Sequence, residues 1–202
     1  MDPLPIVVLC SVACPEGESL TMVAILSLKP NVSQDEAVRV FTSAGLGTLY
    51  WRMRSGPLQR IAGVYVPFFL YRVRYELAGA PQTRLFALDA VDGSLDLLEF
   101  PSVPDESQLL ALETRNCLLP VLSVTRATEL LRDKVLRVIF QQGFFKLRQP
   151  KLEITREPID LHLPYWLAFY GKEAVRCRAM DAVRRRIEGP KASTFFEEWL
   201  AA

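Results

Sequence analysis

Two segments of the chain repeat apolar residues at the spacing of an α-helix. Residues 33–45 begin with Ser33 and Glu36, which have the spacing of a capping box, and they end in glycine. Residues 125–143 carry an apolar stripe behind Thr125, which we take as the N-cap, and they also end in glycine. Near the C-terminus, Thr194 and Glu197 repeat the capping-box spacing and predict a short third helix.

Between these helices apolar residues alternate with polar ones, which is typical of half-buried strands. The first group of such segments consists of residues 49–55, 63–77, 83–91 and 94–100. The second and third of these are expected to pair as an antiparallel hairpin, and Asp92-Gly93 is the clearest turn signal after them. After Gly143 short alternating segments follow again, bounded by proline, glycine and charged residues, at 144–149, 151–155, 158–163, 165–171 and 174–183.

The second group of strands resembles the first. The octapeptide RLFALDAV at 84–91 returns as RCRAMDAV at 176–183. The spacing from the helix-ending glycine to a proline in the next aromatic segment, Pro67 or Pro164, also nearly recurs. We therefore predict an α+β fold of two tandem units, each a helix followed by an antiparallel meander. Because each unit is small, we favour two units that share one sheet or core.

These patterns divide the chain into five parts. The predicted boundaries are 1–32 for an N-terminal extension, 33–100 for the first unit, 101–123 for a linker, 124–190 for the second unit and 191–202 for a C-terminal helix. Met22 could serve as a start by itself, so the first 21 residues could be peripheral to the domain or absent from it.

Composition narrows the class of protein. The chain has 202 residues, of which 50% are hydrophobic and 23% charged, and a formal net charge of +1, as expected of a soluble globular protein. The positive residues of the second half are spread among acidic ones, so nucleic acid is not the expected partner. Residues 5–14, PIVVLCSVAC, are too short to span a bilayer. We expect a cytoplasmic location. Export is the alternative because of this apolar segment, although the segment lacks the positive n-region of a secretory signal.

Few residues point to catalysis or to a cofactor. Four cysteines and one histidine do not have the spacing of a metal site, and Cys117 and Cys177 are expected to be small buried side chains. Neither a glycine-rich phosphate loop nor a nucleophile elbow is present in the sequence. We therefore expect no metal, no cofactor and no enzymatic activity.

Two polar groups still require interpretation. His162 alternates with leucines and is expected to share a solvent-facing side with Asp160, with a proton-transfer pair as the alternative. Asp89 and Asp181 occupy matching places in the repeated octapeptide. Such residues usually cap the turn after a strand by accepting backbone N–H groups, and a symmetric carboxylate pair is the catalytic alternative.

Aromatic residues gather at matching places in the two units, in VPFFLY at 66–71 and LPYWLAFY at 163–170. At strand spacing they lie on both faces of a sheet. We expect a core on both sides, covered by a helix on one and by the linker or the C-terminal segment on the other, and an exposed aromatic surface on one face is the alternative. The candidate binding residues are Tyr71, Arg72, Arg74, Tyr165, Trp166, Tyr170, Arg184 and Arg186.

Residues 71–96, YRVRYELAGAPQTRLFALDAVDGSLD, resemble the PepSY family, whose small α+β units end in a Val-Asp-Ala-x-x-Gly turn. Leu88 to Gly93 stand in that place here, whereas the second unit has Arg184-Arg185 in place of Asp-Gly. The resemblance implies a non-enzymatic binding or inhibitory module, often outside the cytoplasm.

The sequence thus predicts a non-catalytic module that binds a protein or peptide through an exposed sheet face or edge. The alternative is a small-ligand or lipid-binding protein with an aromatic cleft between helix and sheet. A carboxylate-based enzyme at the interface of the two units is the least favoured hypothesis. The oligomeric state does not follow from the sequence.

Overall fold

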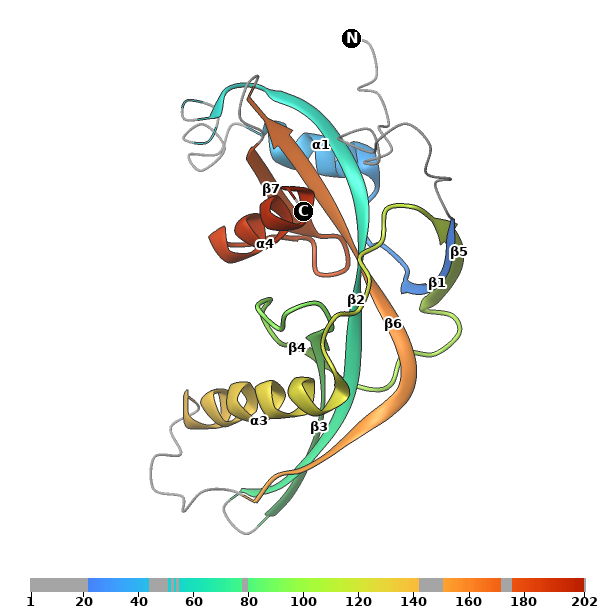
Figure 1. Cartoon of the computed structure of the whole chain (residues 1–202), viewed down its shortest axis with the longest axis vertical. Helices are drawn as coiled ribbons and strands as arrows, with labels where there is room; N and C mark the ends of the chain where they lie inside the picture. The colour runs from blue at the N-terminus through green and yellow to red at the C-terminus, as the bar shows by residue number, and fades with distance from the viewer. Residues whose placement is uncertain are drawn as a thin grey trace.

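The structure is a computed structural model that describes residues 22–43, 51, 53, 55–77, 80–141, 151–171 and 176–201. These residues form a mixed α+β fold with one curled sheet of eight strands (Figure 1). Two long antiparallel strands, β2 (Leu58–Leu77) and β6 (Glu153–Tyr170), run side by side through its centre. The α+β class predicted from the sequence is therefore confirmed.

Each long strand turns back into a hairpin. β2 pairs with β3 (Ala80–Asp89), which pairs with the short β4 (Leu98–Phe100). β6 pairs with β7 (Arg176–Asp181), which pairs with β8 (Arg186–Ile187). The two hairpins extend in opposite directions, because β2 and β6 are antiparallel neighbours.

The remaining strands lie on the far side of β6. β1 (Val23–Leu28) meets β6 in a parallel contact at Ser27 and His162, and β5 (Leu109–Thr114) pairs antiparallel with β1. Thus β1 falls within the predicted N-terminal extension, and β5 falls within the predicted linker. Both segments contribute strands to the same sheet as the two hairpins.

The alternating residues of β2 and β6 divide the core between the two faces of the sheet. On one face a central cluster includes Val66 and Leu163 and is covered by α4 (Pro190–Ala201) through Phe195 and Phe196. On the other face, α3 (Val124–Gln141) packs on the β2–β3 hairpin, and α1 (Gln34–Thr42) packs near the C-terminal end of β6. Figure 1 shows α1 and α3 at opposite ends of the long strand pair.

The predicted helices form, with corrections at their starts. Ser33 and Glu36 make both hydrogen bonds of the capping box of α1. α3 begins at Val124, and the Ser123 hydroxyl accepts the N–H of Arg126 at 3.2 Å, so Ser123 takes the capping place that we gave to Thr125. α4 begins at Pro190, one turn before Thr194, because proline is well suited to a first helical position.

Three strand predictions are wrong. Trp51, Met53 and Ser55, within the predicted strand 49–55, are helical. Only residues 98–100 of the predicted strand 94–100 form a strand. The segments predicted at 151–155, 158–163 and 165–171 are one continuous strand, β6, and Pro158 lies in it where the register with β2 shifts. The segment predicted at 174–183 does form a separate strand, β7. Alternation over five or six residues is too short a pattern to distinguish these cases. The predicted segment 144–149 lies outside the described residues.

Candidate functional site

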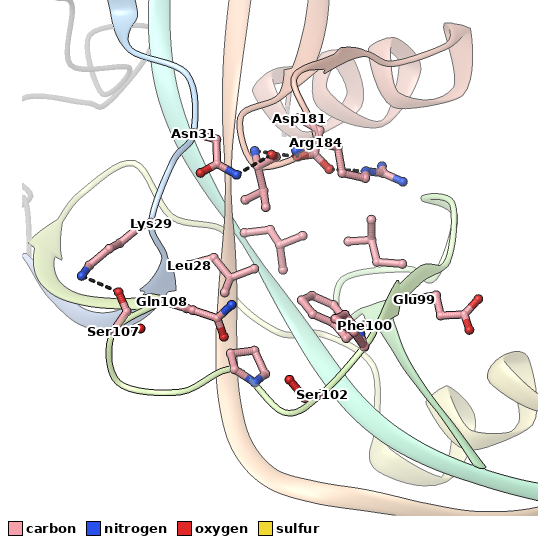
Figure 2. Close-up of a pocket in the computed structure, with 15 residues that line it drawn as sticks. Leu28, Lys29, Asn31, Glu99, Phe100, Ser102, Ser107, Gln108, Asp181 and Arg184 are labelled. Atoms are coloured by element: carbon pink, nitrogen blue, oxygen red, sulfur yellow. Dashed lines mark hydrogen bonds and ion pairs between the residues drawn. The ribbon is translucent and has the colours of Figure 1, made fainter. Parts of the chain in front are cut away.

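A pocket of about 430 Å³ opens where four separate segments meet (Figure 2). Leu28 and Lys29 come from the end of β1, and residues 98–108 come from β4 and the connection to β5. Leu163 lies in the middle of β6, and residues 181–184 form the turn after β7. The volume is within the range of pockets that hold small molecules.

The floor of the pocket is part of the main core. Leu28, Leu98 and Leu163 line it and are at least 95% buried, and all three belong to the central apolar cluster. Phe100 and Val183 also line the pocket and pack against the same cluster while remaining partly exposed. An apolar group that enters here would therefore contact the core directly.

One wall is the turn after β7, and Asp181 organises it. This carboxylate is fully buried and accepts the backbone N–H groups of Val183 and Arg184, both at 2.8 Å. The guanidinium of Arg184 donates to Asp181 at 2.7 Å and to Glu188 at 2.8 Å. Partial burial disfavours the charged guanidinium, but these two carboxylates outweigh that effect and raise the pKa of Arg184.

The opposite wall carries hydrogen-bonding groups at the rim. The ammonium of Lys29 donates to the carbonyl of Ser107 at 2.6 Å, and the Gln108 amide oxygen accepts the N–H of Asp105 at 3.1 Å. Asn31 donates from its amide to the carbonyl of Val183 at 2.8 Å and so ties the end of β1 to the Asp181 turn. In Figure 2 Leu28 and Gln108 lie across the pocket from Phe100, whereas the Lys29 side chain points away from the cavity toward Ser107.

Of the candidate binding residues, only Arg184 lines this pocket. Tyr71, Tyr165 and Tyr170 are at most 2% exposed, so they do not form the exposed aromatic surface that we considered. Trp166 is half-buried and donates from its indole nitrogen to the carbonyl of Val32 at 2.9 Å. Both faces of the sheet carry apolar clusters at these places, so the aromatic residues pack in the core instead.

The other candidate arginines are engaged in ion pairs at the surface. Arg72 pairs with Glu157 at 2.6 Å and Arg74 with Glu153 at 3.7 Å, both across β2 and β6. Arg186 reaches Glu188 at 3.2 Å and Asp96 at 3.4 Å. The structure therefore distributes the eight candidates over both hairpins and does not gather them into one site.

Asp89 caps the turn after β3, as the sequence analysis expected. Its carboxylate accepts the N–H groups of Asp92, Gly93 and Leu95 at 3.1, 2.8 and 3.0 Å. Burial raises the pKa of Asp89, although these backbone donors act in the opposite direction. Asp89 and Asp181 each accept the backbone N–H groups of their own turn, which is the turn-capping role that the sequence analysis expected.

His162 lies in a second pocket of about 380 Å³, together with Asp160 and Arg156. Asp160 pairs with Arg156 at 2.6 Å, so its partner is the arginine and not the histidine. Burial lowers the pKa of His162, and its Nδ1 is buried without a hydrogen-bond partner. This arrangement favours the neutral imidazole, and the negative charge of Asp160 opposes this effect of burial on the pKa of His162. His162 and Asp160 thus share one side, as expected, but His162 is half-buried there and not solvent-facing.

The cysteines and acids do not assemble a metal centre in the part of the chain that the structure describes. Cys117 and Cys177 are free, and burial raises the pKa of Cys177 to about 12, so this thiol stays protonated and inert near neutral pH. Cys10, Cys14 and the apolar segment 5–14 lie outside the described residues. Within the described helices, none has the length and apolar character required to cross a membrane.

The sequence analysis missed most of the pocket residues. Leu28 and Lys29 stood in the predicted extension, and Gln108 stood in the predicted linker. Nothing in the local pattern of these residues marks a site, because the pocket depends on how distant segments meet. Comparison with known proteins adds no relative, since no protein-family model, no curated protein and no solved structure matches the chain.

Proposed function

We propose that this protein is a non-catalytic binding protein that takes a small ligand with an apolar body into the 430 Å³ pocket. The observation that carries the proposal is that the floor of the pocket is the core itself, at Leu28, Leu98 and Leu163, while polar groups surround its rim. This combination of an apolar body and a few placed polar groups is typical of ligand pockets. The apolar lining residues are four aliphatic residues, two prolines and one aromatic residue, Phe100, so the pocket differs from the aromatic cleft that the sequence analysis gave as the alternative.

Binding is favoured over catalysis because the charged groups of the turn are already engaged. Asp181 accepts hydrogen bonds from two backbone N–H groups and from Arg184. Arg184 is held by Asp181 and Glu188. A general acid or base requires a proton that it can give or take, and these groups instead stabilise the turn.

A second candidate function is binding of a protein or peptide at the sheet edge. β5 stands at the end of the strand order, and Leu110 on it is 40% exposed. Edge strands are usually protected by lysine, proline or a bulge, and β5 is a regular strand of sequence LLALET. An extended peptide could add to such an edge. Binding through an exposed sheet face, in contrast, is not supported, because the aromatic residues that would form that surface are buried.

We also propose that the chain consists of two degenerate copies of one unit. Phe68 pairs with Asp89 in the first hairpin, and Tyr165 pairs with Asp181 in the second. Each hairpin is closed by the same backbone bond, from Ala90 N to Pro67 O at 2.8 Å and from Ala182 N to Pro164 O at 3.0 Å. Val66 and Leu163 are the residues that precede these two prolines, and they pair directly with each other. A pseudo-twofold axis that relates the two copies would pass through this pair and requires such a pairing.

The segments before the helices match as well. Asn31 N donates to Ala182 O, and Val121 N donates to Ala90 O, both at 2.8 Å. Each donor lies two residues before the serine that caps α1 or α3. In this proposal each copy begins before its helix, and the segment leading to the helix binds the Asp-Ala turn of the other copy. The copies would then be intertwined, which explains why α1 packs with Tyr170 of β6 and α3 with Tyr71 of β2.

The resemblance of the first unit to the PepSY family stays a proposal. The helix α1, the β2–β3 hairpin and the Asp89 turn support it, because they follow one another in the order of that family's units. A cytoplasmic location stays a proposal too, supported by the free thiols of Cys117 and Cys177.

The ligand-binding proposal is tested by titrating the ¹⁵N-labelled chain with octanol and octanoate and following its amide resonances. We expect shifts that saturate and that centre on Phe100, Gln108 and Val183. Val183→Phe fills the pocket and should abolish them. Val121→Phe is the matched control, because Val121 is 75% exposed and lies outside the pocket.

Thermal unfolding shows whether Val183→Phe is folded. If it is not, Ser102→Trp at the exposed rim replaces it as the blocking variant. Absence of saturable shifts with either probe, or shifts that persist in the filled pocket, would contradict the proposal.

A further inference from the structure

We propose that a cavity between α3, α4 and the connection from β3 to β4 binds the phosphate group of a small phosphate monoester. We call it the α3–α4 cavity. The inference goes beyond the proposed function, because this cavity shares no lining residue with the 430 Å³ pocket. It rests on three cations that line the cavity and that have no carboxylate at ion-pair distance among the described residues.

The α3–α4 cavity has a volume of about 390 Å³ and is formed by segments that are distant in the sequence. Residues 93–97 contribute from the connection between β3 and β4, and Lys191 contributes from α4. Lys134, Arg137 and Val138 come from α3, where a spacing of three or four residues puts them on one face. Figure 1 shows the connection before β4 between α3 and α4.

A hydrogen bond places the ammonium of Lys134 at this cavity. The ammonium donates to the carbonyl of Leu95 at 2.5 Å, and the two neighbours of Leu95 in the sequence, Ser94 and Asp96, both line the cavity. An ammonium group has three donors. The described residues supply no other hydrogen-bond acceptor to it, so two donors are left for a ligand.

The charges of the lining side chains do not balance. Arg137 and Lys191 are exposed, and neither they nor Lys134 has a carboxylate at ion-pair distance among the described residues. Asp96 is the carboxylate that lines the cavity, and it lies 3.4 Å from Arg186. Three positive charges therefore stand against one negative charge, and that one already has a cationic partner.

The pKa of Lys134 supports this description. Burial lowers the pKa, and the positive charge of Lys191 lowers it as well. The carboxylates of Asp89, Asp96 and Asp92 act in the opposite direction, and the pKa is still below its usual value. The charged ammonium is thus disfavoured, and an anion bound beside it would stabilise it.

A phosphate monoester has the chemistry that these groups bind. It carries about 1.5 to 2 negative charges at pH 7 and three acceptor oxygens. Lysine and arginine are the usual side chains that bind phosphate. Lys191 is the second residue of α4, so the positive end of the helix dipole adds to the attraction there. The volume is near the lower end of the range for ligand pockets, which favours a small molecule.

The test titrates the full ¹⁵N-labelled chain with glycerol 3-phosphate and follows its amide resonances, with calorimetry to measure the affinity. We expect shifts that saturate and that centre on residues 93–97 and Lys191. Glycerol, which has no charge, should not bind, and acetate, which has one charge, should bind more weakly. The affinity for glycerol 3-phosphate should decrease as salt is added.

Variants of the cavity cations identify the site. Arg137→Met and Lys191→Met change exposed positions and should fold, and each should weaken glycerol 3-phosphate binding by about fivefold. Arg132→Met is the matched control, because Arg132 is exposed on the same helix but does not line the cavity. It should bind like the wild type.

Three outcomes would overturn the inference. The first is the absence of saturable binding of glycerol 3-phosphate. The second is an equal loss of affinity in Arg132→Met and Arg137→Met, which would show attraction to positive charge in general. The third is binding to vesicles that contain phosphatidic acid without binding of glycerol 3-phosphate, since the ligand would then be a lipid surface. The octanol and octanoate titrations of the 430 Å³ pocket are independent of all three, so failure of one proposal leaves the other intact.

Discussion

The Asp89 turn allows a quantitative test of how the hairpin ends are held. Asp89 is fully buried, and its Oδ1 accepts the N–H groups of Asp92 and Gly93 while its Oδ2 accepts that of Leu95. In Asp89→Asn one oxygen becomes an NH₂ group. If the remaining oxygen still accepts the N–H groups of Asp92 and Gly93, the N–H of Leu95 faces the new NH₂ group, which is also a donor.

The expected cost follows from these contacts. A buried donor without an acceptor costs about 1–3 kcal/mol. Burial raises the pKa of Asp89, which shows that the charged carboxylate is itself disfavoured there, and asparagine avoids this penalty. We therefore expect the free energy of unfolding to fall by about 1–2 kcal/mol in Asp89→Asn. For a chain of this length that lowers Tm by about 2–8 °C. Asp89→Ala, which leaves all three N–H groups without their acceptor, should lose about 3 kcal/mol or more.

Urea unfolding followed by circular dichroism at pH 7 measures these differences. Asp133→Asn on the exposed side of α3 is the matched control and should be neutral within about 0.5 kcal/mol. If Asp89→Asn and Asp89→Ala are both as stable as the wild type, the carboxylate does not hold the turn and our interpretation of Asp89 is wrong.

Three further predictions concern single positions. Gly93→Ala should lower the free energy of unfolding by about 1–2 kcal/mol or more, because Gly93 has φ +73° and an added Cβ would lie 2.9 Å from Leu130; equal stability in urea would contradict this. Arg185 has φ +58°, so Arg185→Gly should raise stability by about 1 kcal/mol by removing left-handed strain, and a lower Tm would refute it. Burial lowers the pKa of His162 below its usual 6.5, so the unfolded chain binds the proton more readily and stability falls as the pH drops through 6.5. This part of the loss should be absent in His162→Gln. If the free energy of unfolding falls equally with pH in the wild type and in this variant, the prediction is wrong.

Local signals in the sequence predicted those parts of the fold that depend on neighbouring residues. The capping box at Ser33 and Glu36 predicted the start of α1, and the alternation before and after residues 78–79 predicted the β2–β3 hairpin. The Asp89 turn followed from the same reasoning, because its donors lie within six residues of the carboxylate. In these cases the interactions that form the structure join residues that are close in the sequence, so a local pattern is enough to predict them.

Long-range pairing was not predictable in the same way. β1 and β5 come from segments that look like an extension and a linker, and they become strands because they pair with each other and β1 also meets β6. The aromatic residues of β2 and β6 fit both faces of a sheet, so their pattern alone does not say which face is covered. The pocket depends on the long-range strand pairing, since Lys29, Gln108 and Arg184 come together only after these strands have paired.

The most direct test of ligand binding in this pocket is a set of intermolecular nuclear Overhauser effects between octanoate and the protein. Our account predicts contacts from the octanoate tail to the methyl groups of Leu28 and Val183 and to the ring of Phe100. Contacts to Leu110 on β5 instead, or saturable binding with no contact to the three pocket residues, would contradict it.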